Sequence, residues 1–373
     1  MLNVLHLIHY MGGGGTESYI YSLAKKLHNN KCRFYIAYSI PGPGLLLFKN
    51  MEIDTIQFDM NSPYDFKAIK ALKELCEKLS IDVIHTHFLR ENYISVLSKI
   101  IGNKAAVINT SHVLYQNKKS VMFTNRFITR HNSKIIAVSN AVKEHLIKEG
   151  IRSKKIQVIY NGIDMDYWSM EREFGIRQEF SIDNDDFVIV SVARFSDEKG
   201  HHFLLETIAL LKELIDAEKI KYPKIKFLLV GDGELLCQCK GLAINLGINE
   251  DVIFTGHRTD IKSILRNCDL FVCHSKSEAL GISILEALAC GLPVIATDSG
   301  GTNEVINNNT DCGILVDYGD KEGLARAIIK LVLDKALYEK YKENGYSTLI
   351  EKFNLDKTAE ETHALYSSSI ILR

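Results

Sequence analysis

Residues 278–306 read EALGISILEALACGLPVIATDSGGTNEVI, and this stretch decides the fold class. The apolar run Leu270–Cys273 just before it, and Val294–Ala296 inside it, have the length of short buried strands. Between them, Gly281 opens a helical pattern that Gly291 closes. The order of strand, helix and strand predicts a parallel sheet with helix N-termini at the carboxyl ends of its strands. Such an N-terminus favours an anionic ligand, above all a phosphate.

Two carboxylates in this stretch are separated by seven residues. Taken alone, Glu278 is an ordinary loop charge and Glu286 a solvated helix residue. However, Glu286 has apolar neighbours, and a carboxylate there needs hydrogen-bond donors, such as sugar hydroxyls. With Gly281 and Gly300-Gly301 around it, the spacing resembles the Glu-x7-Glu signature of the family-four retaining glycosyltransferases, which have the GT-B architecture. The resemblance extends over nearly the whole chain.

The resemblance implies two doubly wound, Rossmann-like α/β domains that face each other across a cleft. Strands alternate with helices in both halves of the chain, which favours the same class. We expect an acceptor-binding domain over residues 1–164 and a nucleotide-sugar-binding domain over residues 165–354. The boundary falls at Asn161-Gly162-Ile163-Asp164, where a short hinge would let the domains close on a donor. Residues 355–373 resemble the family's terminal helix, which crosses back to the first domain.

Composition limits the classes of partner. Residues 1–165 hold 22 Lys and Arg against 12 Asp and Glu, whereas the rest of the chain holds 23 against 34. The basic half suggests an anionic membrane surface or a phosphorylated acceptor, and no basic-aromatic motif indicates nucleic acid. None of the eight cysteines has a paired zinc spacing, and no signal peptide or spanning helix is expected. These features predict a cytoplasmic protein with reduced cysteines, peripheral at most on the inner face of the membrane.

A glycine-rich loop, Gly12–Gly15, follows the predicted strand Leu2–Ile8. We expect Thr16 to cap the helix after it. The spacing is neither the dinucleotide fingerprint nor a P-loop, and the loop alone would be a mobile turn. The resemblance implies that it faces the phosphates, with Gly13 on the acceptor side and Gly14 and Gly15 on the donor side.

Histidines end two predicted strands of the first half. His85 is expected to be structural, and His112 resembles the histidine that contacts the donor sugar or helps to position the acceptor. We predict that His87 and Arg90 contribute to acceptor binding nearby. His85, His87 and His112 could also form a metal site, but no carboxylate is placed to complete it.

The loop after the predicted strand Phe187–Ala193 carries Arg194 and Lys199. A guanidinium and an ammonium there can hold a diphosphate, and the pair matches the family's Arg and Lys. The resemblance also places further residues near the donor, most of them for their backbone groups. They are Gly231, His257, Arg258, Ala279, Leu280, Gly281 and Ile282. Arg258 could equally be a plain surface residue.

Residues 113–142 contain no Asp or Glu. Basic residues alternate there with apolar ones, as in an ordinary surface helix or in an amphipathic element that touches anionic lipid. The basic set is Lys118, Lys119, Arg126, Arg130 and Lys134, and the apolar set is Tyr115, Met122, Phe123, Phe127 and Ile128.

Together these features predict a retaining glycosyltransferase in cell-surface polysaccharide or glycolipid synthesis. The donor would be a nucleoside-diphosphate sugar, UDP by default and GDP as runner-up, and the acceptor a carbohydrate or a lipid-linked hydroxyl. His112, Arg194, Lys199 and Glu278 would be catalytic, with Glu278 on the sugar hydroxyls and Glu286 on the ribose. No cofactor or metal is expected, because the resemblance implies a usually metal-independent family in which cationic side chains do a metal's work. The alternatives are a nucleotide-sugar epimerase or phosphorylase of the same architecture, and a non-catalytic nucleotide-sugar-binding protein.

Overall fold

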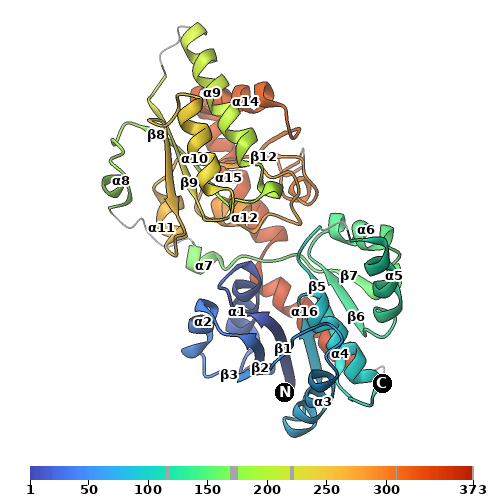
Figure 1. The fold of residues 1–373 in the computed structure, drawn as a ribbon. Helices are drawn as coiled ribbons and strands as arrows, with labels where there is room; N and C mark the ends of the chain where they lie inside the picture. Colours follow the sequence, from blue (N-terminus) through green and yellow to red (C-terminus); the bar gives the residue numbers. More distant parts are fainter. Residues whose placement is uncertain (115–116, 169–174, 219–221, 308, 372–373) are drawn as a thin grey trace. The chain divides into compact units, whose positions relative to one another are not determined.

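The computed structural model describes residues 1–114, 117–168, 175–218, 222–307 and 309–371. The chain forms two compact units, drawn in Figure 1. The first unit contains Met1–Gly162 together with Leu355–Arg373, and the second contains Ile163–Asn354. The division between Gly162 and Ile163 therefore falls two residues before the domain boundary expected after Asp164.

The first unit is built on a parallel sheet of seven strands in the order β3-β2-β1-β4-β5-β6-β7. The sheet reverses its winding between β1 and β4, which is where ligands bind in doubly wound folds. Its strands are β1 Leu2–Tyr10, β2 Cys32–Ile40, β3 Asp54–Gln57, β4 Val83–Thr86, β5 Ala106–Ser111, β6 Lys134–Ala137 and β7 Ile156–Val158. Its helices are α1 Gly15–Leu27, α2 Leu46–Lys49, α3 Phe66–Lys78, α4 Leu89–Ile100, α5 Lys119–Ile128, α6 Asn140–Lys148 and α16 Leu355–Ile371.

Local sequence explains where these helices begin. Asp65 caps α3 by accepting hydrogen bonds from the backbone N–H groups of Lys67 and Ala68, as expected of an N-cap aspartate. The prediction that Thr16 caps α1 is wrong, because the helix already begins at Gly15 with Gly14 as its N-cap.

The last helix belongs to the first unit. Helix α16 packs against α1 and β5, and its Tyr366 is fully buried in the core of this unit. The Tyr366 hydroxyl also hydrogen-bonds Nδ1 of His85 at 2.6 Å. Residues more than 280 positions apart thus share one core.

The second unit has a parallel sheet of six strands in the order β10-β9-β8-β11-β12-β13. Its strands are β8 Phe187–Val192, β9 Ile225–Val230, β10 Val252–Gly256, β11 Leu270–Cys273, β12 Val294–Thr297 and β13 Gly313–Val316. Its helices are α7 Met165–Trp168, α8 Ile176–Glu179, α9 His201–Glu218, α10 Leu236–Asn245, α11 Ile261–Arg266, α12 Ile282–Ala289, α13 Thr302–Val305, α14 Lys321–Leu333 and α15 Lys335–Lys352. Strand β13 was not predicted, and it is half-buried along its whole length.

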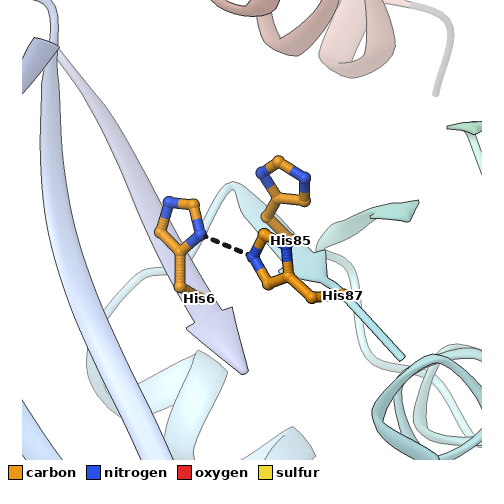
Figure 2. Close-up of side chains that lie close together, drawn as sticks. All are labelled: His6, His85 and His87. Carbon is orange, nitrogen blue, oxygen red and sulfur yellow. Dashed lines mark hydrogen bonds between the residues drawn. The ribbon is translucent and has the colours of Figure 1, made fainter. Parts of the chain in front are cut away.

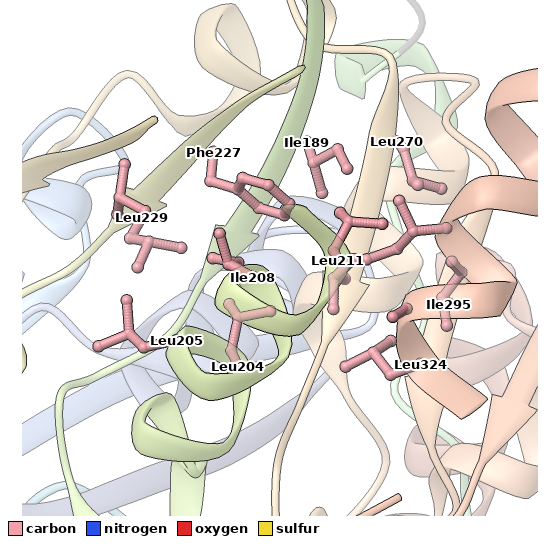
Figure 3. Close-up of a cluster of buried hydrophobic side chains, with 14 of the residues drawn as sticks. Ile189, Leu204, Leu205, Ile208, Leu211, Phe227, Leu229, Leu270, Ile295 and Leu324 are labelled. Atoms are coloured by element: carbon pink, nitrogen blue, oxygen red, sulfur yellow. The ribbon is translucent and has the colours of Figure 1, made fainter. Parts of the chain in front are cut away.

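Helices α9 and α14 bury their apolar faces on this second sheet. Figure 3 shows Ile208 and Leu211 of α9 and Leu324 of α14 gathered with strand side chains such as Phe227 and Ile295. Strands β9 and β12, which carry Phe227 and Ile295, are buried along most of their length. Such burial is typical of a parallel sheet covered on both faces.

The predicted fold class, two Rossmann-like parallel-sheet α/β units, is confirmed. The strand predicted at Leu270–Cys273 lies where expected. None of the helices within the described ranges has the length and apolarity needed to cross a bilayer.

Candidate functional site

Two loops of the second unit bring a lysine and a glutamate together. Lys199 follows β8 and Glu278 follows β11, and these strands are neighbours in the sheet. Lys199 Nζ lies 2.7 Å from Glu278 Oε2, and the two side chains are only 23% and 15% exposed. Burial on its own would lower the pKa of Lys199, but the charge and hydrogen bond of Glu278 raise it above its usual value. The lysine is therefore a fixed cation at the carboxyl edge of the sheet.

Residues that the sequence analysis missed hold this pair in place. Ser275 donates a hydrogen bond to Glu278 Oε2 at 3.1 Å. The His274 ring joins the backbone carbonyl of Lys199 (2.6 Å) to the hydroxyl of Ser191 (2.9 Å). Burial lowers the pKa of His274 to about 4, so the ring is neutral at physiological pH. His274 and Ser275 directly follow the strand Leu270–Cys273. Their polar character at that position was the sequence signal that could have identified them.

Glycines let the loops approach one another closely. Gly281 has φ +90° and is the N-cap of α12, a conformation that residues with a side chain rarely adopt. A Cβ on Gly301 would lie 2.0 Å from the carbonyl oxygen of Ala279, and one on Gly231 would lie 2.0 Å from that of Ala193. Backbone thus lies against backbone around the pair, and α12 begins four residues beyond Glu278.

Glu286 lies within α12, three residues before its last residue. Burial raises the pKa of Glu286 to about 8, and among the described residues none donates a hydrogen bond to its carboxyl group. The Glu286 side chain is half-buried, and a carboxyl group that is partly removed from water without a donor is costly. It suits a ligand that brings its own hydroxyl groups.

Other predicted donor residues have contacts of their own. Arg194 is 62% exposed and pairs with Glu198 at 3.3 Å. Arg258 is engaged by Asp260 (2.6 Å) and by Glu179, whose hydrogen bonds raise its pKa. His257 is exposed beside it. These contacts hold the Arg258 side chain in place, and its part in donor binding stays a prediction.

Three predicted backbone contributors lie between Glu278 and the first residue of α12, that residue included. Ala279 and Leu280 are buried, and Ile282 is half-buried as the first residue of the helix. The N–H of Glu278 is bonded to the Ser299 carbonyl at 2.7 Å, so the segment is fastened to the neighbouring loop.

In the first unit, the glycine loop is closed by an acidic side chain of its own helix. The Glu17 carboxylate accepts hydrogen bonds from the N–H groups of Gly13 and Gly14, both at 3.1 Å. The predicted phosphate-facing N–H groups are therefore already satisfied in this structure. Glu17 was missed, although a glutamate two residues into the helix is a frequent N-terminal residue.

Histidines gather at the middle of β1 and at the carboxyl ends of β4 and β5. His6 Nδ1 lies 3.1 Å from His87 Nε2, and His87 Nδ1 lies 3.1 Å from His112 Nε2. Figure 2 shows the first of these contacts, with His85 stacked nearby. Burial lowers the pKa of His6 to about 3 and that of His112 to about 4. The three rings therefore form a chain of neutral imidazoles that ends at half-buried His112.

A metal could be held by His6, His85 and His87, whose ring nitrogens come within 4.8 Å of one another. The trio differs from the one expected, because His6 replaces His112. Both nitrogens of His85 are already bonded, to Tyr366 and Thr110 at 2.6 Å. In the described part of the chain, only Nε2 of His6 lacks a partner among these six nitrogens. The arrangement fits a hydrogen-bonded network better than an ion site.

Arg90, a predicted acceptor-binding residue, lies at the start of α4, in the segment that follows β4. It donates to the Met60 carbonyl at 3.1 Å and contacts Nε2 of His9. His9 N–H in turn donates to buried Glu91 at 2.6 Å.

Helix α5 falls within the predicted basic amphipathic segment. Phe123 and Phe127, one turn apart, are 75% and 55% exposed, whereas Ile128 is buried. Tyr115 lies outside the described residues. The two exposed aromatic rings, together with Lys119 and Arg126 of the same helix, give α5 a surface that is both apolar and basic.

Comparison with known proteins gives two family matches that follow the two units. Residues 13–167 match the family described as Glycosyltransferase Family 4, and residues 173–348 match Glycosyl transferases group 1. The second match contains Lys199, Glu278 and Glu286.

Curated relatives cover most of the chain. An N-acetyl-alpha-D-glucosaminyl L-malate synthase of Bacillus anthracis is 26% identical over 327 residues, covering 86% of this chain and 84% of that protein. The UDP-Gal:alpha-D-GlcNAc-diphosphoundecaprenol alpha-1,3-galactosyltransferase of Escherichia coli is 27% identical, covering 82% and 80%.

Among solved structures, Anabaena Alr3699/HepE in complex with UDP and glucose has a similar fold. The TM-score is 0.87 at 22% identity, with 99% of this chain and 100% of that chain covered.

Proposed function

The chain belongs to the family-four, group 1 glycosyltransferases with the GT-B architecture, and on that premise we propose that it transfers a sugar from a UDP-sugar to an acceptor hydroxyl with retention of anomeric configuration. The observation that carries this proposal is the meeting of Lys199 and Glu278 beside the N-terminus of α12. A cation and a helix start form a site for a diphosphate. The adjoining carboxylate suits the hydroxyls of the sugar.

Charge develops on the diphosphate as the donor reacts. The bond between the anomeric carbon and the phosphate oxygen breaks, a bond to the acceptor oxygen forms, and the acceptor proton leaves with the diphosphate. Lys199 and the first N–H groups of α12 would stabilise the leaving group, since preorganised donors act most strongly in a site with little water. Arg194 is exposed and would add a second cation when it turns toward the phosphate.

Glu286 is proposed to bind the ribose hydroxyls. Its half-buried carboxyl group, which has no donor among the described residues, supports this role, because two neighbouring hydroxyls would supply the missing donors. UDP is favoured because the Escherichia coli relative is named for a UDP-galactose donor and the Anabaena protein was crystallised with UDP.

The acceptor is proposed to be a growing glycan or a lipid-linked sugar in polysaccharide or glycolipid synthesis. The diphosphoundecaprenol in the name of the Escherichia coli relative supports a lipid-linked acceptor. Phe123 and Phe127 on basic α5 support a contact with an anionic membrane surface. Gly13, His87, Arg90 and His112 remain predicted contributors on the acceptor side.

A thermal-shift screen of UDP- and GDP-sugars tests the donor. A ligand at ~100 times its dissociation constant should add ~2.7 kcal/mol of stability. Hits are then incubated with and without glycan acceptors, and NMR of the product reports the anomeric configuration. An altered sugar formed without acceptor would identify an epimerase, and an inverted product would contradict retention.

A further inference from the structure

A cavity of about 730 Å³ opens in the first unit. It is separate from the chain of His6, His87 and His112. The segments that precede β5, β6 and β7 form it together with the end of α16. It therefore lies at the amino-terminal edge of the parallel sheet, whereas His87 and His112 follow strands at the carboxyl edge. Its lining residues are Lys99, Asn103, Lys104, Arg130, His131, Asn132, Ser133, Lys134, Lys155, Ser368 and Ser369.

The lining of this cavity is cationic and contains no carboxylate. Lys155 Nζ donates to the Asn132 carbonyl at 2.6 Å, and Lys134 Nζ donates to the Lys154 carbonyl at 3.1 Å. These neutral acceptors satisfy hydrogen bonds but leave the charges uncompensated. Within the described ranges, neither lysine forms an ion pair with an acidic side chain.

Lys155 shows the effect of having other positive charges close by. Burial lowers its pKa, and the nearby cations Lys134, Lys154 and Arg152 lower it further. An anion among these groups would relieve the repulsion and favour the charged lysine.

A buried hydroxyl group points to the same kind of ligand. Ser369 of α16 lines the cavity and is only 4% exposed. Its Oγ has no hydrogen-bond partner among the described residues. Buried hydroxyls are normally bonded, so this one is available as a donor to a bound group.

We propose that this cavity binds a small phosphorylated ligand. Lys104, Arg130, Lys134 and Lys155 would hold the phosphate oxygens, with Arg130 able to take two of them through its planar fork. Ser369 would donate a further hydrogen bond. The volume is that of a small-molecule site, larger than one phosphate requires, so the ligand has an organic part. A free phosphorylated compound and a lipid headgroup share this chemistry.

Inorganic pyrophosphate is the probe, because it carries only the shared chemistry. Calorimetry of the full-length protein should show a binding event that the triple variant K104Q/R130Q/K155Q weakens by at least ~10-fold. The variant K67Q/K78Q/K148Q is the matched control, since it removes three exposed cations from the same unit. The event should persist in Lys199→Ala, which separates it from phosphate binding in the second unit.

Ser369→Ala provides a variant that keeps every charge and adds no atoms. It should weaken pyrophosphate binding by about fivefold or more, as expected for a lost hydrogen bond to an anion. If the two triple variants titrate pyrophosphate alike, the cavity is not an anion site.

Vesicles separate the two sources of phosphate. Sedimentation with phosphatidylglycerol vesicles is compared for the two triple variants, with phosphatidylcholine vesicles as the neutral control. A loss specific to K104Q/R130Q/K155Q assigns the cavity to a lipid headgroup. Equal sedimentation of the two, together with lost pyrophosphate binding, assigns it to a free phosphorylated compound.

Discussion

Lys199 Nζ and Glu278 Oε2 lie 2.7 Å apart although 79 residues separate them in the chain. The pair forms because two adjacent strands end at the same edge of the sheet. In the protein without ligand, each charge neutralises the other. A donor that binds here must exchange this contact for contacts with phosphate and sugar.

Breaking this pair should destabilise the second unit. Among the described residues, Lys199→Met leaves the Glu278 carboxylate with only the Ser275 hydroxyl as a side-chain hydrogen-bond donor. We expect a loss of roughly 2–3 kcal/mol in the free energy of unfolding, below the ~3–5 kcal/mol of a fully buried pair because both side chains keep some exposure. Urea denaturation measures it. The control is Lys276→Met, whose partner Asp197 is exposed, and which should cost below ~1 kcal/mol. Equal losses would show that the Lys199 pair adds nothing special.

Donor affinity should depend on the protonation of Glu286. Its pKa of about 8 means that the free protein holds it protonated at pH 6 to 7. If ribose hydroxyls donate to the carboxylate, binding releases a proton, so affinity should rise as pH increases toward 8 and then level off. The gain approaches ~10-fold per pH unit well below the pKa. Calorimetry with UDP at pH 6, 7 and 8 measures it, and Glu286→Gln should remove the dependence. An affinity that falls over this range would rule out a carboxylate that accepts these hydroxyls.

Gly301, which lies against the backbone of Ala279, should not tolerate a side chain. In Gly301→Ala the new Cβ would meet the Ala279 carbonyl at 2.0 Å, so the loops must move apart. We expect ~1–3 kcal/mol of destabilisation and weaker UDP binding. Gly241→Ala in α10 is the matched control, because its Cβ meets nothing within 4 Å and should stabilise the helix by ~0.5–1 kcal/mol. Thermal unfolding of both variants gives the comparison, and a normal Gly301→Ala would show that the loops can adjust.

Acid should unfold the protein through its buried histidines. Burial lowers the pKa of His6 in the folded protein to about 3, from its ordinary value of 6.5. The stability that comes from keeping this ring neutral is present above pH 6.5 and is lost as pH falls toward 3, at up to ~1.4 kcal/mol per pH unit.

His6→Phe should make unfolding less dependent on pH between 6.5 and 4. The phenyl ring keeps the packing on Phe34, whose ring centroid lies 4.7 Å from that of His6, but cannot take up a proton. Urea denaturation at several pH values gives the number of protons taken up on unfolding, which should fall by about one. An unchanged number would mean that His6 titrates normally in the folded protein.

Membrane contact should depend on the exposed rings of α5. The double variant Phe123→Ser with Phe127→Ser should lose most of its sedimentation with phosphatidylglycerol vesicles, since both rings are exposed on a basic helix. Phe66→Ser is the control, because Phe66 is 71% exposed on another helix of the same unit. High salt should release the wild-type protein. Vesicle binding that survives the double change would move the contact elsewhere.

The sequence by itself determined the class of fold and the family. Short apolar runs such as Leu270–Cys273, separated by helical periods, allow only a parallel α/β sheet, because strand and helix periodicities are local properties. The spacing from Glu278 to Glu286 within one stretch was sufficient for the resemblance. Position after a strand also pointed to Lys199 and His112, since the carboxyl ends of parallel strands share an edge.

Only the tertiary structure decided which of these groups meet. The pairing of Lys199 with Glu278, the chain from His6 through His87 to His112, and the cationic cavity around Lys155 join residues far apart in sequence. Such contacts depend on strand order and side-chain packing, which no local pattern encodes. Burial also belongs to the folded state, and it is burial that makes Glu286 an acid with a pKa of about 8.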